Sequence, residues 1–325
     1  MTKKFRYIFL LAALTLISCE RIAEIEPATK ACAPMPEGGR AAACACALDG
    51  KAYVFGGRDE KGRYLRDLWE YDPVTDSWNN LGDCPMTARV NATMAAMDGL
   101  LYMGLGYSAK HAYQDSCYQR DWWSYNPKTA QWTRLADYPS QNTVAATTAT
   151  EGDNILVYYG CGHVQQNEVY RYDISANTWQ KWASTGNTAP RAFGCAGAAI
   201  GSYLYFGTGF NSNNLTNWYK ASLVDNTWQR VRSLPGKGRE FAACAATDKY
   251  VYIFGGRYFG GDMTGGEIFN TYMRYSPDKD QWEWCDTMPC GRAENQIAVT
   301  ISGKVYFGLG ENENAQIINT LYTIE

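Results

Sequence analysis

The chain has 325 residues, of which 46% are hydrophobic, 14% aromatic and 19% charged, and its formal net charge is −3. A mildly acidic chain without a basic cluster does not favour nucleic acid as a partner. Only two histidines occur, His111 and His163, so a metal centre built on histidine lacks ligands and no cofactor is expected. The eleven cysteines include no Cys-x-x-Cys pair and are expected to serve mainly as small buried residues.

The first eighteen residues, MTKKFRYIFLLAALTLIS, combine a basic start with an apolar run. This pattern is typical of a secretion signal, and the run is short for a membrane span. The LISC ending resembles a bacterial lipobox, which implies cleavage before Cys19 and lipidation of its sulfur. We expect residues 1–18 to be a lipoprotein signal peptide and residues 19–25 a lipidated tether, which predicts a membrane-anchored lipoprotein of the cell envelope, periplasmic or on the outer-membrane surface. An ordinary signal peptide or a short membrane anchor is the alternative.

Downstream of this segment, one pattern returns six times. Each copy contains an apolar segment that ends in paired or nearly paired glycines, as in YVFGG and YMGLG. The second glycines of the six copies are Gly57, Gly106, Gly162, Gly209, Gly256 and Gly310. Their separations of 47 to 56 residues are typical of propeller blades.

A tyrosine and a tryptophan seven residues apart follow the glycines, as in Tyr71 and Trp78. This pair recurs in the first five copies, except that Ala221 replaces the tyrosine of the fourth. A two-residue turn such as Asp98–Gly99 separates the first two apolar segments of a copy, which is a hairpin signal. Each copy therefore predicts four short antiparallel strands, and the whole predicts an all-β, six-bladed β-propeller over residues 26–325.

Paired glycine, then tyrosine, then tryptophan, with PR or a near variant before the first strand, resembles the kelch repeat. The TAR ending at Arg89 and the PRAF of residues 190–193 are such variants. The resemblance covers roughly residues 27–325, although only the first and fifth copies keep a true Gly-Gly and the sixth lacks the tryptophan. It implies a kelch propeller that binds ligands beside the glycines and at the starts of the first strands. Some kelch propellers are copper-radical oxidases, whose set of two histidines and two tyrosines this chain does not supply convincingly.

The sixth copy has no fourth strand, because the chain reaches Glu325 just after LYTI. Upstream of the first copy, Pro36 and Arg40 stand where later copies have their proline and arginine, and Thr29 falls at the tryptophan position. We therefore expect residues near 26–33 to complete the sixth blade and so to remove two open sheet edges.

Loop lengths select one end of the ring as the binding end. In each copy, the loops that connect the first strand to the second and the third strand to the fourth are short. The loops that connect the second strand to the third, and one copy to the next, are long and varied, and variable loops usually carry function. The residues directly after the second glycines stand at the inner rim of that end: Arg58, Tyr107, His163, Phe210, Arg257 and Glu311. We expect residues at the starts of the first strands to lie at the same rim: Asn91, Phe193, Glu240, Phe241, Glu294 and Asn295.

Arg257, Glu311 and Arg58 come from consecutive copies, so we expect them side by side with net positive charge. The aromatic half of the rim suits the apolar face of a sugar or peptide, and arginines suit a carboxylate. The first hypothesis is therefore a binding module for carbohydrate or another polar or acidic ligand, which includes a glycan, a peptide or a partner protein. A purely structural belt of ion pairs is the alternative.

The second hypothesis is a metal-free sugar epimerase or mutarotase. Six-bladed kelch propellers of the bacterial envelope include N-acetylneuraminate epimerases, and VYFGLG at residues 305–310 is similar to a segment of those enzymes. Interconversion of anomers needs an acid and a base beside the ring oxygen and the anomeric hydroxyl. The candidates for these roles are Glu311, Glu294, Glu240 and His163, and neither role is assigned to a single residue.

Overall fold

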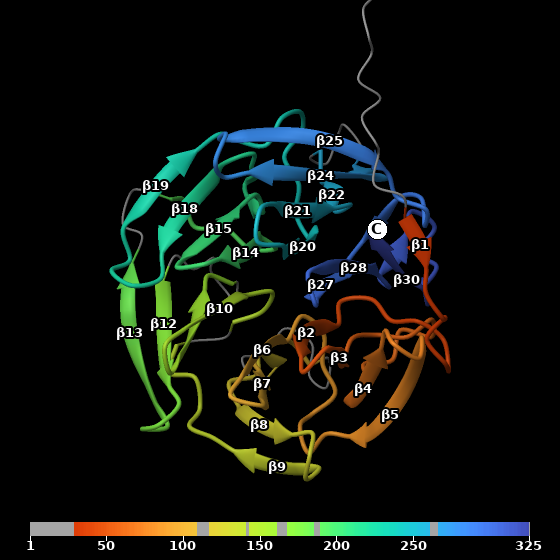
Figure 1. Cartoon of the computed structure of the whole chain (residues 1–325), viewed down its shortest axis with the longest axis vertical. Helices are drawn as coiled ribbons and strands as arrows, with labels where there is room; N and C mark the ends of the chain where they lie inside the picture. The colour runs from red at the N-terminus through yellow and green to blue at the C-terminus, as the bar shows by residue number, and fades with distance from the viewer. Residues whose placement is uncertain are drawn as a thin grey trace, which may run out of the picture.

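The computed structural model describes residues 29–108, 117–140, 143–160, 168–184, 189–260 and 266–324. Six four-stranded antiparallel sheets are arranged around a central axis (Figure 1). This arrangement confirms the predicted all-β, six-bladed propeller. In the described ranges, no helix is long and apolar enough to cross a bilayer.

Each blade runs from an inner strand at the axis to an outer strand at the circumference. Blade 1 consists of β2 (Cys44–Leu48), β3 (Lys51–Phe55), β4 (Asp67–Asp72) and β5 (Ser77–Asp83). Blade 2 consists of β6 (Thr93–Met97), β7 (Leu100–Gly104), β8 (Trp122–Asn126) and β9 (Gln131–Arg134). Blade 3 consists of β10 (Thr147–Glu151), β11 (Asn154–Tyr158), β12 (Glu168–Asp173) and β13 (Thr178–Ser184). Blade 4 consists of β14 (Ala196–Ile200), β15 (Tyr203–Gly207), β18 (Trp218–Ser222) and β19 (Trp228–Val231). Blade 5 consists of β20 (Ala243–Ala246), β21 (Val251–Phe254), β24 (Thr271–Ser276) and β25 (Gln281–Thr287). Blade 6 consists of β27 (Ile297–Ile301), β28 (Lys304–Gly308), β30 (Leu321–Ile324) and β1 (Thr29–Ala31).

The sixth blade is closed by the N-terminal strand, as predicted. β1 pairs antiparallel with β30, Thr29 lying opposite Ile324. Within β30, Leu321 lies opposite Gly308 of β28, close to the glycine that begins the variable loop, so Ile324 and Thr29 lie at the other end of the blade. The chain before Thr29 therefore joins the propeller at the end with the short turns.

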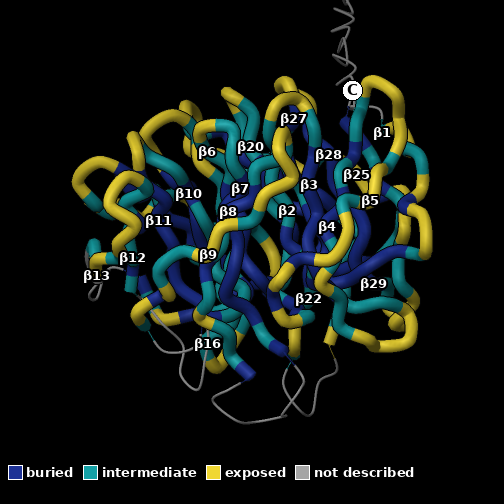
Figure 2. Tube along the Cα trace, turned by 90° about the horizontal axis from the view of Figure 1, so that it is seen from below, coloured by how far each residue is buried: buried dark blue, intermediate teal, exposed yellow. Residues whose placement is uncertain are grey.

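The two ends of the propeller differ in the length of their loops (Figure 2). Short exposed hairpins form one edge of the molecule in this view, and β16 (Phe210–Asn211) and β22 (Arg257–Tyr258) lie at the opposite edge. Both of these short strands directly follow a second glycine. We call this end, which carries the longer loops, the mouth.

In blades 1, 3 and 5 the recurring tyrosine and tryptophan hold the blade to the preceding one. In blade 3, Trp179 donates from Nε1 to the carbonyl of Ala136 at 2.9 Å, and its ring lies 4.9 Å from that of Tyr172. Asn177, between the two, accepts hydrogen bonds from the Tyr172 hydroxyl at 2.7 Å and from the Ala136 amide at 2.9 Å. Blades 1 and 5 repeat this clamp with Tyr71, Asp76, Trp78 and Ala33 and with Tyr275, Asp280, Trp282 and Arg232. The seven-residue spacing thus serves an inter-blade contact.

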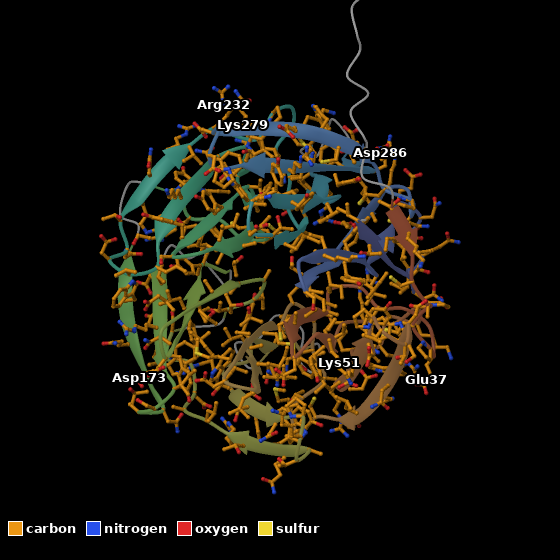
Figure 3. All side chains as sticks on the ribbon, viewed as in Figure 1. Glu37, Lys51, Asp173, Arg232, Lys279 and Asp286 are labelled. Atoms are coloured by element: carbon orange, nitrogen blue, oxygen red, sulfur yellow. The ribbon has the colours of Figure 1, made fainter. Side chains whose placement is uncertain are left out.

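The clamps lie far from the axis. Figure 3 shows Arg232, Lys279, Asp173 and Glu37 at the outer circumference of the ring. The charged side chains that matter for a central site must therefore come from other positions.

In blades 1, 2 and 5 the arginine before the inner strand is a buried structural cation, whereas Arg191 of the PRAF segment is exposed. Arg89 is fully buried, donates to the Leu105 carbonyl at 3.0 Å and makes two hydrogen bonds to Asp121, at 2.6 and 3.0 Å. Asp121 also accepts from the Trp123 indole at 3.0 Å. The arginine therefore joins the glycine turn to the start of the third strand, which explains why it recurs.

The same arrangement is complete in blade 1 and incomplete in blade 5. Arg40 pairs with Asp67 through two hydrogen bonds, at 2.9 and 3.0 Å. Arg239 donates to the Gly255 carbonyl at 2.9 Å, but Thr271 occupies the position of the aspartate. Burial without a carboxylate partner lowers the pKa of Arg239 to about 10. Its guanidinium lies 4.1 Å from the centre of the Phe269 ring instead.

Candidate functional site at the propeller mouth

Glycine brings the two predicted sets of rim residues together. Gly256 has φ +84°, and a Cβ there would lie 2.7 Å from the carbonyl oxygen of Glu240; Gly310 has φ +87°, and a Cβ there would lie 2.5 Å from that of Glu294. Only glycine permits both the conformation and the approach. The next residue therefore pairs with a first-strand start across the rim: Arg58 with Ala41, Tyr107 with Val90, Phe210 with Phe193, Arg257 with Glu240, and Glu311 with Glu294. His163 and Cys19 lie outside the described residues.

A ring of left-handed residues narrows the mouth. One residue of each blade, just before the inner strand, has φ between 51° and 62°: Ala42, Asn91, Ala145, Gly194, Phe241 and Asn295. Backbone hydrogen bonds link neighbours in this ring, such as Asn91 N–H to the Ala42 carbonyl at 2.8 Å and Ala42 N–H to that of Asn295 at 3.0 Å. Below it, the inner strands enclose a channel of about 580 Å³ lined largely by alanine, threonine and cysteine.

Blades 5, 6 and 1 form the charged sector of the mouth. Arg257 donates from Nε to Oε1 of Glu240 at 3.0 Å and lies 3.5 Å from Oε2 of Glu294. Arg58 forms an ion pair with Glu311, which also accepts from Asn295 Nδ2 at 2.9 Å. The side chains of Arg257 and Arg58 are 40% and 30% exposed, whereas those of the three glutamates are at most 9% exposed. The arginines therefore cover the carboxylates and face the solvent.

Burial and mutual repulsion disturb the titration of this sector. Burial raises the pKa of Glu294 to about 7, and Glu311 and Glu240 add to the rise while Arg257 opposes it. Burial also raises the pKa of Glu240 despite its bond to Arg257. For Arg257, burial lowers the pKa, but Glu294 and Glu240 outweigh it and raise the pKa above its ordinary value. A carboxyl that is about half protonated at pH 7 thus lies beside a permanently charged guanidinium.

The expected net positive charge of this sector is wrong. That expectation counted Arg58, Arg257 and Glu311 alone, whereas Glu240 and Glu294 lie against Arg257 as well. With every group ionised, two arginines face three glutamates, so the net charge is −1. Arg257 moreover contacts these two glutamates rather than Glu311.

The remaining rim carries aromatic rings, as predicted. Phe193 lies 5.7 Å from Phe210 and 5.8 Å from Phe241, measured between ring centres, and the Arg257 guanidinium lies 5.4 Å from the Phe241 ring. The sequence-based hypothesis missed Phe259, 5.8 Å from Phe210, together with Tyr64 and Tyr118, which flank Tyr107 at 6.4 and 5.4 Å. These residues lie in the variable loops, where the repeat has no register, and their only signal is aromatic character.

Clusters of metal ligands and reactive thiols are the other features that could mark a site in the described part of the chain. Within it, no group of three or more His, Cys, Asp or Glu side chains is arranged to hold a metal ion. Cys44 is a free thiol, and burial raises its pKa to about 12. Such a thiol is protonated at neutral pH and is a poor nucleophile. The mouth is therefore the candidate site.

Comparison with known proteins agrees with this architecture. A family model described as "KLHDC2/KLHL20/DRC7 Kelch-repeats domain" matches residues 14–209, more than half of the chain. The chain belongs to the kelch-repeat family. A second family model, N-acetylneuraminate epimerase, matches residues 189–323. These findings confirm the kelch resemblance.

Individual kelch relatives are distant in sequence. Kelch-like protein 25 of Xenopus tropicalis is 25% identical over 83% of this chain and 45% of its own length, so the chain spans about half of that relative. An N-acetylneuraminate epimerase of Escherichia coli O139:H28 is 24% identical over 74% of this chain and 79% of its own length. The solved structure of YjhT superposes with a TM-score of 0.74 at 14% identity, covering 90% of this chain and 96% of that one. At this identity, the structural likeness shows the fold alone.

The raised pKa of Glu294 predicts a pH-dependent stability of this kelch propeller. Because the folded-state pKa of about 7 exceeds the ordinary value of 4.5, the favourable contribution is complete below pH 4.5 and is lost as the pH rises through 7. Glu294→Gln should therefore raise the unfolding free energy by about 2–3 kcal/mol at pH 8.5 and by little at pH 5. Urea unfolding at both pH values measures this, and an equal effect at both would contradict it.

Proposed function

We propose that this kelch propeller is a ligand-binding module of the cell envelope, anchored by a lipid on Cys19, whose mouth takes an acidic carbohydrate. The observation that carries the proposal is the pair of half-exposed guanidinium groups, Arg58 and Arg257, of which Arg257 lies beside a cluster of phenylalanines. Arginine binds carboxylates through two parallel hydrogen bonds, and aromatic faces accept the apolar face of a sugar ring.

Arg257 is oriented for a ligand. The only hydrogen bond that Arg257 donates to a described side chain uses Nε, which leaves its two terminal nitrogens for a ligand. Phe241 lies beneath the guanidinium and the carboxylates of Glu240 and Glu294 lie beside it. Such contacts reduce the entropy that the side chain loses on binding.

Thr29, the first described residue, and the mouth lie at opposite ends of the propeller. Thr29, to which the proposed tether of residues 19–25 leads, is at the end with the short turns. A lipid on Cys19 would therefore leave the mouth facing away from the membrane and open to a glycan, a peptide or a partner protein.

Binding of sugar acids tests the proposed ligand class. N-acetylneuraminate and glucuronate should bind more tightly than uncharged glucose in calorimetric titrations. Arg257→Ala should weaken the two acids by about 1.5–3 kcal/mol and leave glucose nearly unchanged, because charge-assisted hydrogen bonds are lost. Arg66→Ala is the matched control, since Arg66 pairs with exposed Asp83 on the surface. Equal affinities of the acids for both variants would contradict the proposal.

Membrane attachment has a separate test. Cys19→Ser should block processing or move the protein from the detergent phase to the aqueous phase, because a serine cannot carry the thioether-linked lipid. Cys32→Ser, which changes the next cysteine in the chain, should leave partitioning unchanged. Detergent partitioning of Cys19→Ser identical to that of the parent protein would overturn the lipoprotein assignment.

A second candidate function is a metal-free sugar mutarotase or epimerase. The observation that favours it is the neutral-range pKa of Glu294, about 7, which suits a group that gives and takes a proton near pH 7. One group would take the proton of the anomeric hydroxyl while another gives a proton to the ring oxygen. Glu311 is held by Arg58 and Asn295, so Glu294 and Glu240 are the stronger candidates for these steps.

Anomer equilibration distinguishes the two functions. An enzyme should accelerate the interconversion of N-acetylneuraminate anomers, followed by NMR, and Glu294→Gln should abolish the acceleration while the sugar still binds. A binding module should show no acceleration in either form.

A further inference from the structure

The charge of the mouth is unbalanced at Arg257. One guanidinium lies within 3.0 Å of Glu240 and within 3.5 Å of Glu294. The third carboxylate, Glu311, is already neutralised by Arg58. When all these groups are ionised, the environment of Arg257 carries an excess negative charge that opposes the approach of an anion.

Two acceptor atoms in this cluster are buried without a donor. Oε2 of Glu240 and Oε2 of Glu294 receive no hydrogen bond from any described residue, and the two residues are 2% and 6% exposed. A buried ionised carboxylate without a donor loses its hydration and gains little in return. A proton on one of these oxygens removes that cost.

The groups that face Glu294 come from four neighbouring segments. They are Arg257 on β22, Glu240 before β20, Glu311 on β29 (Glu311–Asn312), and Arg58 after β3. On its own segment, β26 (Ala293–Glu294), the nearest charged residue is Arg292, which pairs with Glu267 and Glu313 instead. Of the three glutamates, only Glu294 faces Arg257 at ion-pair distance without a hydrogen bond.

We propose that the mouth takes up one proton, on Glu294, together with each anionic ligand group that binds to Arg257. The inference rests on the proposed function, because it concerns the same site and the same ligand class. The proton comes from solvent and forms an O–H bond on the Glu294 carboxylate, and no other covalent bond changes. Protonation cancels the excess negative charge beside Arg257, so the incoming anion replaces Glu294 as the counter-ion of the guanidinium.

The titration of the free protein supports this coupling. Burial raises the pKa of Glu294 to about 7, so the group is partly protonated before any ligand arrives. A ligand carboxylate about 5 Å away raises that pKa further, by roughly two units at an effective dielectric constant near 20. Proton uptake is therefore expected between about pH 7 and pH 9, and affinity falls as the pH rises through this range.

Glucuronate is the probe, because its carboxylate stays ionised from pH 6 to pH 8.5. Its affinity for the full chain should be roughly tenfold higher at pH 6 than at pH 8. Calorimetry in two buffers of different ionisation enthalpy should count an uptake of more than half a proton per ligand at pH 8. Glu294→Gln should bind with nearly constant affinity across this range and without proton uptake, because glutamine supplies the neutral side chain permanently. Glu267→Gln, which removes a partly buried carboxylate at the same end that pairs with Lys237 rather than Arg257, should retain the pH dependence of the parent.

Failure of the proton coupling and failure of the proposed function give different results. Glucuronate binding with constant affinity and no proton uptake in the parent would overturn the coupling and leave the proposed function standing. Coupling that persists in Glu294→Gln would overturn the assignment to this residue. Failure of glucuronate to bind at any pH would overturn both the proposed function and the coupling.

Discussion

Replacing Asp121 with alanine is expected to lower the unfolding free energy by about 3–5 kcal/mol, because it leaves a buried arginine without its counter-ion. Arg89 is fully buried, and Asp121 supplies two of its hydrogen bonds, at 2.6 and 3.0 Å. The carbonyls of Thr87 and Leu105, which remain as acceptors, cannot neutralise the charge. Urea unfolding followed by tryptophan fluorescence measures the loss.

The control for Asp121 is the exposed pair of Arg66 and Asp83, whose side chains are 50% and 58% exposed. Asp83→Ala should cost less than about 1 kcal/mol, since solvent screens an exposed ion pair. A loss for Asp121→Ala as small as that of Asp83→Ala would show that the buried pair is not what stabilises the start of the third strand.

Replacing Trp179 with alanine is expected to destabilise the propeller by a similar amount, about 3–5 kcal/mol. Its ring lies 5.4 Å from Trp122, 5.0 Å from Tyr138 and 4.9 Å from Tyr172, and its indole donates to the Ala136 carbonyl. The substitution therefore opens a cavity between two blades and leaves the carbonyl without its donor.

The control for Trp179 is Trp284, which is 59% exposed on an outer strand. Trp284→Ala should cost less than about 1 kcal/mol because little buried apolar surface is lost. Glucuronate binding by Trp179→Ala, measured well below its melting range, should match that of the parent protein. A loss of binding without a loss of stability would contradict the structural role of this residue.

The propeller could be predicted because its determinants repeat. Each blade has to solve the same packing problem, so Gly256 and Gly310 stand in register where the rim backbone approaches closely, and Tyr172 and Trp179 stand in register at an inter-blade clamp. Closure by Thr29 was predictable for the same reason, because an N-terminal segment in register could supply the missing strand. A packing requirement that recurs in successive blades therefore appears in the sequence as residues repeated at a regular spacing.

The mouth could be predicted only in part, because ligand-facing positions are where the copies differ. Register identified Arg58, Arg257 and Glu311 as rim residues, but Tyr64 and Tyr118 come from loops of unequal length that carry no register. Their approach to Tyr107 depends on the path of the loop.

By itself, the sequence determined the six blades, their closure and the end that carries the variable side chains, because these depend on local spacing that is repeated along the chain. Only the tertiary structure decided the charge of the site. Glu240 and Glu294 belong to different blades, and they meet at Arg257 because the ring brings neighbouring blades together. The resulting burial and repulsion, which raise the pKa of Glu294, arise from distances between segments that no local pattern encodes.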